Sequence, residues 1–199
     1  MELLAEAGVP EARRDAIARW LDLVRTWNAR IDLTAAKGDR ELVDLMVADA
    51  LVLATKIADG ARVVDVGSGA GAPGFALALL RPDLKVTLVE PLAKRVSFLR
   101  TAIGTLARTD VELVRAKADD VVKERGRAFD VAISRATLPP PEWLPVGLSL
   151  APVVWTLLAR DEPPASPNAT LDDDLTYTWP LGGAGRRAVR HLLQDATSR

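Results

Sequence analysis

Two patterns of apolar residues divide the chain near residue 60. Before that point, apolar positions recur every three or four residues, a period typical of amphipathic helices. The stretch 11–30 carries one such stripe, which comprises Ile17, Trp20, Leu21, Val24 and Trp27. The stretch 39–58 carries a second stripe, and Gly60 is a residue suited to end that helix. The sequence therefore predicts an N-terminal helical extension over residues 1–59.

After residue 60, short apolar runs alternate with helical segments. Runs rich in valine, isoleucine and leucine predict strands at residues 62–66, 85–89, 111–114, 129–133 and 153–158. The segments between them predict helices at residues 72–80, 92–107, 118–125 and 140–150. Strands that alternate with helices form a mainly parallel sheet covered on both faces. The unbroken apolar character of the runs fits strands that are buried on both sides.

The C-terminal part of the chain follows a third pattern. Residues 161–174 combine proline, aspartate and serine, and they predict a loop. Residues 175–179 and 186–193, with a glycine-rich link between them, predict a hairpin, although the second of these segments is also compatible with a helix. Residues 60–199 are therefore expected to form an α/β domain that makes one compact unit with the N-terminal extension.

Composition narrows the classes of function. The chain has 199 residues, a net charge of −1, no cysteine and a single histidine, His191. Disulfides and thiolate metal sites are excluded, and neither a histidine metal cluster nor a Ser-His-Asp triad is expected. The N-terminus lacks a secretory pattern, and no apolar run reaches the roughly 18 residues of a membrane span. We therefore expect a cytoplasmic protein without metal or membrane contact and without an overall basic field.

The loop after the first predicted strand holds the strongest candidate chemistry. The stretch VVDVGSGAGAPG, residues 63–74, places four glycines in one turn. Glycines let a ligand approach the backbone because no Cβ stands in the way. In a doubly wound sheet, ligands bind beside such loops at the carboxyl ends of the strands. The predicted cofactor-binding residues of the loop are Gly67, Ser68, Gly69, Gly71 and Ala72.

Two cofactors compete for this loop. The spacing Gly67-x-Gly69-x-x-Ala72 also satisfies the dinucleotide pattern G-x-G-x-x-G/A. Glu90 ends the second predicted strand, where a carboxylate can accept ribose hydroxyls from either a dinucleotide or S-adenosylmethionine. Asp65 precedes the loop, and its charge would repel a pyrophosphate but suit a sulfonium amino acid. Asp65 therefore favours S-adenosylmethionine as the cofactor.

Three segments together resemble one family. WNARIDLT, the run from VVDVGSGAGAPG through KRVSFLR, and FDVAISRA are similar to the bacterial 16S ribosomal RNA guanine-N7 methyltransferases called RsmG or GidB. The resemblance covers about residues 15–140. It implies a Rossmann-like class I fold with a seven-stranded sheet, S-adenosylmethionine as cofactor, and 16S ribosomal RNA or the small ribosomal subunit as partner.

The resemblance also implies roles for individual residues. Ala118 and Asp119, after the third strand, would lie beside the adenine of the cofactor. Arg135, at the end of the fourth strand, would lie beside the donor or the target and is the candidate catalytic residue. Guanine N7 already carries a free lone pair, so methylation there needs no general base. The enzyme mainly has to hold donor and acceptor in line.

The chain departs from the family pattern on the side expected to face RNA. The family commonly has His-x-x-Asp-Ser in the second helix, where this chain has Met46 and Ala50 around Asp49. Lys117 replaces an arginine, and residues 158–161 lack an expected Lys-Gly pair. A second hypothesis is therefore a cofactor-binding homologue with another substrate or without catalysis. A third is an NAD-dependent oxidoreductase, which only the spacing of the glycine loop favours. Under the first hypothesis we expect the protein to be a monomer.

Overall fold

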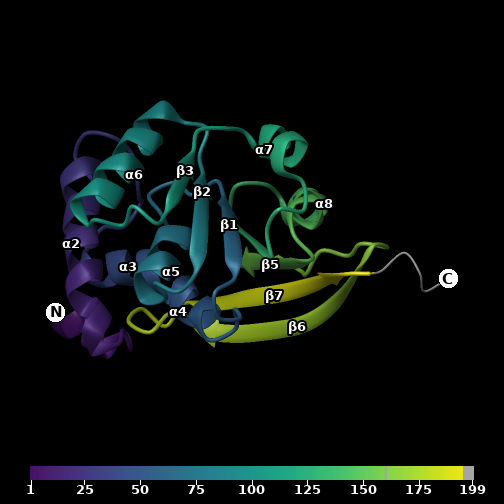
Figure 1. The fold of residues 1–199 in the computed structure, drawn as a ribbon. Coiled ribbons are helices and arrows are strands. Elements are labelled where there is room, and N and C mark those ends of the chain that lie inside the picture. The colour runs from purple at the N-terminus through teal and green to yellow at the C-terminus, as the bar shows by residue number, and fades with distance from the viewer. Residues whose placement is uncertain (160, 195–199) are drawn as a thin grey trace.

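A seven-stranded sheet forms the centre of the molecule in a computed structural model, which describes residues 1–159 and 161–194. The strands follow the order β3-β2-β1-β4-β5-β7-β6 across the sheet (Figure 1). Strand β7 runs antiparallel to both β5 and β6, whereas the pairs among β1 to β5 are parallel. The strands are β1 (Arg62–Val66), β2 (Lys85–Val89), β3 (Glu112–Val114), β4 (Val131–Arg135), β5 (Val153–Leu158), β6 (Ala169–Thr178) and β7 (Gly185–Leu193).

The order of the strands explains where a ligand can enter. The chain proceeds outward from β1 through β2 to β3 and then returns to place β4 on the other side of β1. Val64 accordingly pairs with Thr87 on one side and with Ala132 on the other. The connections diverge between β1 and β4, and this leaves a crevice at the carboxyl ends of these strands.

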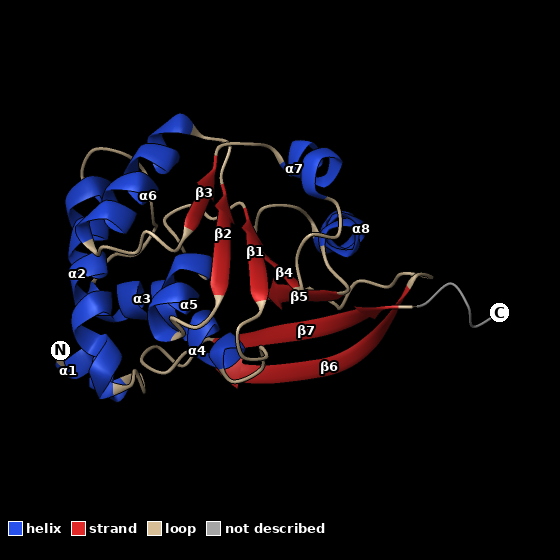
Figure 2. Ribbon diagram, viewed as in Figure 1, coloured by secondary structure: helices blue, strands red, loops and turns tan. Residues whose placement is uncertain are grey.

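Helices cover both faces of the sheet, as Figure 2 shows. One face carries α1 (Glu2–Glu6), α2 (Glu11–Asn28), α3 (Asp39–Val43), α4 (Asp49–Ala54), α5 (Gly74–Leu80) and α6 (Ala93–Thr105). The other face carries α7 (Ala118–Arg125) and α8 (Pro140–Leu150). Side chains alternate between the two faces along β1. Val63 packs into the core beneath α1 to α6, and Val64 packs into the core beneath α7 and α8.

The N-terminal helices share the core of the first face. Trp20 of α2 is fully buried and meets Phe75 of α5 edge to face, with ring centroids 5.8 Å apart. Trp27 makes the same kind of contact with Phe98 of α6, also at 5.8 Å. Both tryptophans of the predicted stripe therefore serve packing, and large aromatic contacts of this kind stabilise the helix–sheet interface.

The predicted helix over residues 39–58 is corrected by the structure. A π-helical turn, Asp44–Ala48, separates α3 from α4, which ends at Ala54. Hydrogen bonds in a π-helix join residues five apart, so such residues lie about one turn above each other. Asp44 and Asp49 have this spacing, and both are buried. Apolar periodicity does not reveal a single wide turn, since the stripe remains on the same side.

The predicted loop over residues 161–174 is also corrected. β6 begins at Ala169, so the acidic run from Asp172 to Asp174 belongs to a strand and not to a loop. Its charges are matched from β7, where Arg187 pairs with Asp174 at 2.6 Å and Arg190 pairs with Asp172. These cross-strand pairs allow an acidic segment, unfavourable for a strand in isolation, to extend the hairpin.

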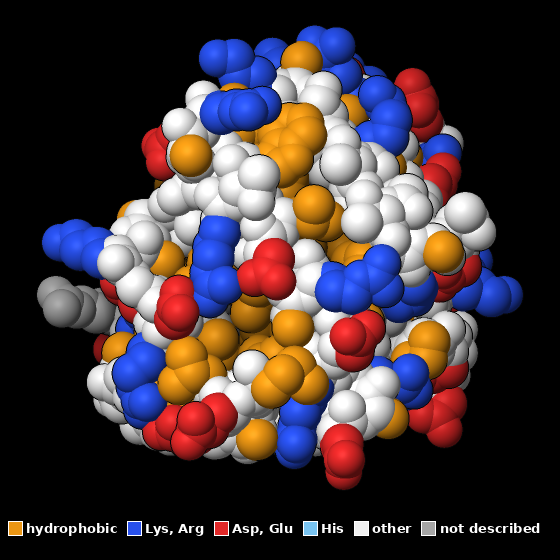
Figure 3. Space-filling view, turned by 90° about the vertical axis from the view of Figure 1, so that its left-hand side faces the viewer, with side chains coloured by type: hydrophobic (Ala, Val, Ile, Leu, Met, Phe, Trp, Pro, Cys, Tyr) orange, Lys and Arg blue, Asp and Glu red, His pale blue; other side chains and the backbone are white. Residues whose placement is uncertain are grey.

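On the face in Figure 3, basic side chains gather along the upper edge, and basic and acidic groups are interspersed over the rest. This pattern agrees with the net charge of −1. Among the described residues, no helix combines the length and apolar character needed to cross a bilayer.

Candidate functional site

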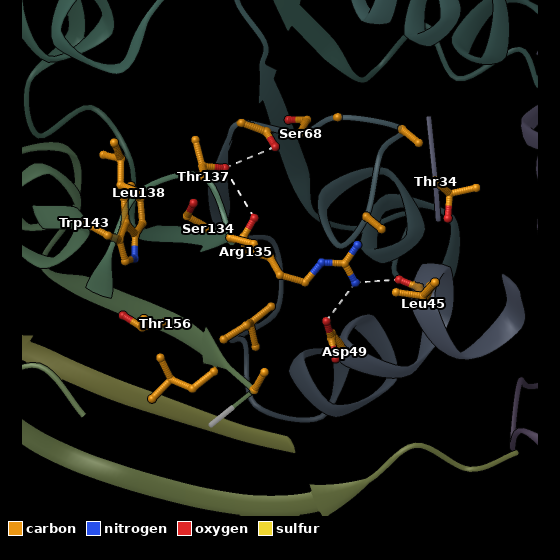
Figure 4. A pocket seen from close by; sticks show the side chains of 18 of the residues that line it. Thr34, Leu45, Asp49, Ser68, Ser134, Arg135, Thr137, Leu138, Trp143 and Thr156 are labelled. Carbon is orange, nitrogen blue, oxygen red and sulfur yellow. Dashed lines mark hydrogen bonds and ion pairs between the residues drawn. The ribbon is translucent and has the colours of Figure 1, made fainter. Parts of the chain in front are cut away.

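A cavity of about 940 Å³ lies at the carboxyl ends of β1, β2, β4 and β5. Its wall on the β1 side is the glycine loop, and its opposite wall is built by the C-terminal hairpin. Figure 4 shows Arg135 extending from the end of β4 toward Leu45 and Asp49, with Thr156 and Trp143 on the other side. Residues from both ends of the chain therefore line one space.

Backbone hydrogen bonds fold the glycine loop onto β2. The amides of Gly67 and Ser68 both donate to the carbonyl of Val89, at 2.8 and 3.0 Å. The Ser68 hydroxyl donates to the carbonyl of Asp65 at 2.9 Å. Gly67 has a φ of +78°, and a Cβ on it would lie 1.9 Å from Oγ1 of Thr137. The loop thus needs glycine at this position to pack against the segment after β4.

Glu90 connects the loop to the end of β2. One carboxylate oxygen accepts the Gly69 amide and the other accepts the Leu92 amide, each at 2.9 Å. The residue is only 1% exposed and lines the cavity. A carboxylate oxygen accepts more than one hydrogen bond, so each oxygen retains capacity toward a ligand. Glu90 is therefore held rigidly as an acceptor.

Asp65 lies behind the loop. Its Oδ2 accepts the amide of Gly74 at 3.0 Å, at the start of α5, and Asp65 is not among the residues that line the cavity. Its Oδ1 has no hydrogen-bond partner among the described residues. Burial raises the pKa of Asp65 to about 6, although the Gly74 amide acts in the opposite direction. The structure gives Asp65 a role in holding the loop, and its role in ligand selection stays a prediction.

The other predicted cofactor residues divide into two groups. Gly67, Ser68, Gly69 and Ala72 line the cavity together with Glu90 and Arg135. Gly71, Ala118 and Asp119 do not, because Gly71 begins the turn into α5 and the other two start α7. Buried His191 lies elsewhere, with its ring nitrogen 2.9 Å from the carbonyl of Pro164, and burial lowers its pKa.

Arg135 is fixed by the π-helical segment. Its Nη1 donates to Oδ2 of Asp49 at 2.9 Å and also to the carbonyl of Leu45 (Figure 4). Its side chain is 24% exposed, whereas that of Asp49 is 2% exposed. A partly buried ion pair with a second acceptor restricts the guanidinium to one orientation. Among the described residues, Nε and Nη2 of Arg135 have no hydrogen-bond partner, and they can donate to a ligand.

Asp49 is a functional candidate that the sequence analysis did not include among the site residues. Its Oδ1 accepts the hydroxyl of Tyr177 at 2.7 Å and the indole Nε1 of Trp179 at 3.4 Å. Burial raises the pKa of Tyr177 well above its usual range, and Asp49 acts in the same direction, so Tyr177 is a protonated donor. Asp49 thus connects Arg135 to the C-terminal hairpin. The one available signal was that it is retained between the altered positions Met46 and Ala50.

The departures from the family pattern fall partly on the cavity. Met46, Leu158, Ala159 and Asp161 line it, whereas Ala50 is fully buried and Lys117 precedes α7. Arg160 lies outside the described residues. Thr156 also lines the cavity, and its buried Oγ1 has no hydrogen-bond partner among the described residues. The altered positions therefore change the wall opposite the glycine loop.

Comparison with known proteins places the chain in a family. The family model for GidB, rRNA small subunit methyltransferase G, matches residues 13–143. A ribosomal RNA small subunit methyltransferase G from Anaeromyxobacter dehalogenans (strain 2CP-C) is 33% identical over 193 residues, which cover 92% of this chain and 89% of that protein. A relative of the same name from Mycobacterium leprae (strain TN) is 42% identical over 125 residues, covering 62% of this chain and 51% of its own.

Some matches extend over only part of the relative. A protein of the same name from Clostridium botulinum (strain Loch Maree / Type A3) is 35% identical over 119 residues, covering 58% of this chain and 50% of its own. The matched region thus spans about half the length of the Clostridium and Mycobacterium relatives.

Solved structures support the fold. TrmN from Thermus thermophilus has a TM-score of 0.55 at 23% identity, covering 73% of this chain and 47% of that one. A SAM dependent methyltransferase from Aquifex aeolicus has a TM-score of 0.54 at 14% identity, and the match covers 78% of this chain and 94% of that one. The predicted Rossmann-like class I fold, with its mainly parallel seven-stranded sheet, is confirmed. The resemblance noted in the sequence is confirmed as well, and the chain belongs to the GidB family of rRNA small subunit methyltransferase G proteins.

Proposed function

We propose that this protein is an S-adenosylmethionine-dependent methyltransferase that modifies N7 of a guanine in 16S ribosomal RNA. The family membership supports the reaction class and the RNA substrate. The observation that carries the choice of cofactor is the hydrogen bonding of the glycine loop. We further expect the protein to act as a monomer in the cytoplasm.

The loop amides distinguish the two cofactors. A dinucleotide site binds pyrophosphate through free amides of this loop and of the helix that follows it. Here the amides of Gly67 and Ser68 donate to Val89, and the amide of Gly69 donates to Glu90. A pyrophosphate would meet occupied donors and the Glu90 carboxylate. This arrangement disfavours NAD and favours a cofactor that brings ribose hydroxyls without a diphosphate.

The shape of the loop also fits S-adenosylmethionine. Gly69 lines the cavity with a φ of +58°, and a Cβ on it would find only the Gly67 carbonyl oxygen within 4 Å, at 3.9 Å. The protein therefore leaves this side of the backbone open. Glu90 and the loop residues Gly67, Ser68, Gly69 and Ala72 would hold the cofactor, with Glu90 accepting hydrogen bonds from the ribose.

Methyl transfer to guanine N7 requires correct positioning of the two reactants and no proton transfer. When bound, the cofactor supplies an electrophilic methyl group on a sulfonium. The protein has to orient the acceptor in line with it, and such positioning accounts for much of the rate in a reaction of this type. Arg135, held by Asp49 and Leu45, presents its remaining donors to the cavity. They suit the O6 of a guanine or a nearby phosphate.

A different substrate is the second candidate. Met46 and Ala159 line the cavity where the family commonly carries polar residues, and they make the acceptor wall more apolar. A homologue that binds the cofactor but methylates another molecule, or none, would have a wall of this kind.

Two measurements test the proposal. Titration calorimetry with S-adenosylhomocysteine should give a binding isotherm, and NAD should give none. Small ribosomal subunits that lack the modification, incubated with methyl-labelled donor, should then incorporate label at one guanine of 16S ribosomal RNA. Tight NAD binding without S-adenosylhomocysteine binding would overturn the cofactor. Donor binding without incorporation into RNA would favour the second candidate.

A further inference from the structure

A groove adjoins the main cavity at the C-terminal hairpin. A second hollow of about 460 Å³ is lined by residues 159 and 161 and by the facing ends of β6 and β7. It shares Ala159, Asp161, Tyr177 and Arg186 with the main cavity. The two spaces therefore adjoin, and Arg186 lines both of them.

Arg186 is held in place by an aromatic ring. Its guanidinium carbon lies 3.7 Å from the centroid of the Trp179 ring, and its Nη1 donates to the carbonyl of Gly185 at 2.8 Å. Trp179 in turn donates to Asp49, the residue that holds Arg135. The cation–π contact and the hydrogen bond to Gly185 restrict the guanidinium, and its Nε and Nη2 have no hydrogen-bond partner among the described residues.

The charge of Arg186 is not balanced locally. The side chain is half-buried, yet among the described residues no carboxylate lies within ion-pair distance of it. The other arginines of β7 differ, because Arg187 pairs with Asp174 and Glu162 and Arg190 pairs with Asp172. A partly desolvated cation without a partner costs free energy, so it is expected where an anionic ligand binds.

We propose that Arg186 binds a backbone phosphate of the RNA strand that carries the acceptor nucleotide, with the strand lying in the groove over the hairpin. This inference rests on the proposed function. A planar guanidinium fixed by stacking matches the geometry of a phosphate and can donate two hydrogen bonds to it. The groove begins at the acceptor side of the cavity and opens outward, as required for a polymer whose one nucleotide enters the site. Asp161, on the groove wall, is the one described carboxylate that opposes the strand there.

Binding of 16S ribosomal RNA transcript, measured by filter retention over a range of salt, tests this inference apart from catalysis. Arg186→Ala should weaken binding by at least about tenfold. It should also lower the slope of log affinity against log salt by about one phosphate contact, that is, by about 0.7–0.9. Arg186→Gln keeps a long polar side chain without the charge, and it should lower the salt slope by the same amount. Arg186→Lys should keep the salt slope of the wild type but only part of its affinity, because lysine lacks the planar guanidinium.

Arg127 offers a matched control. It is exposed and has no ion pair among the described residues, and it precedes the amino end of the central strand β4, whereas the cavity lies at the carboxyl ends of the strands. Arg127→Ala removes the same charge and should leave the affinity and the slope unchanged. S-adenosylhomocysteine binding by calorimetry, retained in every variant, shows that each one is folded.

Equal salt slopes for wild type and Arg186→Ala would overturn the inference, as would the absence of RNA binding by the wild type. A loss in Arg127→Ala equal to that in Arg186→Ala would overturn it too, since the effect would then come from net charge alone. Failure of the proposed function appears differently, as RNA bound by the wild type without transfer of label.

Discussion

Single residues decide what the cavity can accept. Glu90 is immobilised by two backbone amides, so its acceptor direction is set before a ligand arrives. Arg135 is immobilised by Asp49 and the Leu45 carbonyl. Preorganised groups of this kind bind without the loss of side-chain freedom that a flexible contact would bring. Glu90, which accepts hydrogen bonds, marks the place of the ribose. Arg135, which donates them, marks the place of the base that receives the methyl group.

Gly69→Val should abolish donor binding, because the branched side chain would occupy the open side of the loop. Gly69 has a φ of +58° and almost no neighbours there, so the new side chain would project into the cavity. Calorimetry with S-adenosylhomocysteine should show an affinity reduced by at least about a hundredfold, the equivalent of roughly 2.7 kcal/mol.

Gly60→Val provides the control for backbone strain. Gly60 also has a positive φ, +69°, and open space around its Cβ position, but it lies before β1 and away from the cavity. The Gly60→Val variant should bind S-adenosylhomocysteine as tightly as the wild type does. Undiminished affinity in Gly69→Val would show that the loop does not contact the cofactor.

At the level of elements, the π-helical turn connects the N-terminal helices to the C-terminal hairpin. Asp44 accepts the amides of Leu181 and Gly182, at 3.0 and 2.7 Å, in the link between β6 and β7. Asp49, one wide turn later, accepts Tyr177 and Trp179. The turn thus orients two buried carboxylates toward one hairpin, and π-turns often occur at functional sites. Through it, segments from both ends of the chain complete one wall.

Asp44→Ala should loosen the hairpin and destabilise the protein by about 2 kcal/mol, since two charge-assisted hydrogen bonds are lost. Urea unfolding followed by circular dichroism measures the change. Asp15→Ala removes a carboxylate that is 84% exposed and paired only at 3.9 Å, and it should change the free energy of unfolding by less than about 0.5 kcal/mol. Equal stability of the two variants would contradict the anchoring role of Asp44.

In the molecule taken together, two hydrophobic cores lie on either side of one sheet, and the first of them includes residues from Leu4 to Ala188. The free energy of unfolding depends on the protonation of any ionisable group that is buried in the folded state. Asp65 is one such group, because it is buried behind the glycine loop and one of its oxygens lacks a hydrogen-bond partner among the described residues.

The contribution of Asp65 to the stability of the wild type should fall as pH rises from about 4 to about 7. Burial raises the pKa of Asp65 from 3.8 to about 6 in the folded protein. Between these values the folded state holds a proton that the unfolded chain has released, so raising the pH favours unfolding. The full difference is about 3 kcal/mol.

Asp65→Asn carries no such proton, and its stability relative to the wild type should rise over the same interval. Urea unfolding of both proteins at several pH values measures this difference, in which the other titrating groups cancel. Parallel stability profiles would show that Asp65 is not buried as the structure has it.

The sequence alone determined the sheet, most of the helices, the glycine loop and the position of Glu90, because these follow from local periodicity and turn chemistry. It did not determine the π-helical turn, the early start of β6, or the placement of Asp49 beside Arg135 and Tyr177. Those features depend on contacts between segments far apart in the chain, such as the acidic run of β6 with the arginines of β7. Only the folded chain brings these partners together, and a carboxylate acquires its role from the donors that surround it, which no local pattern specifies.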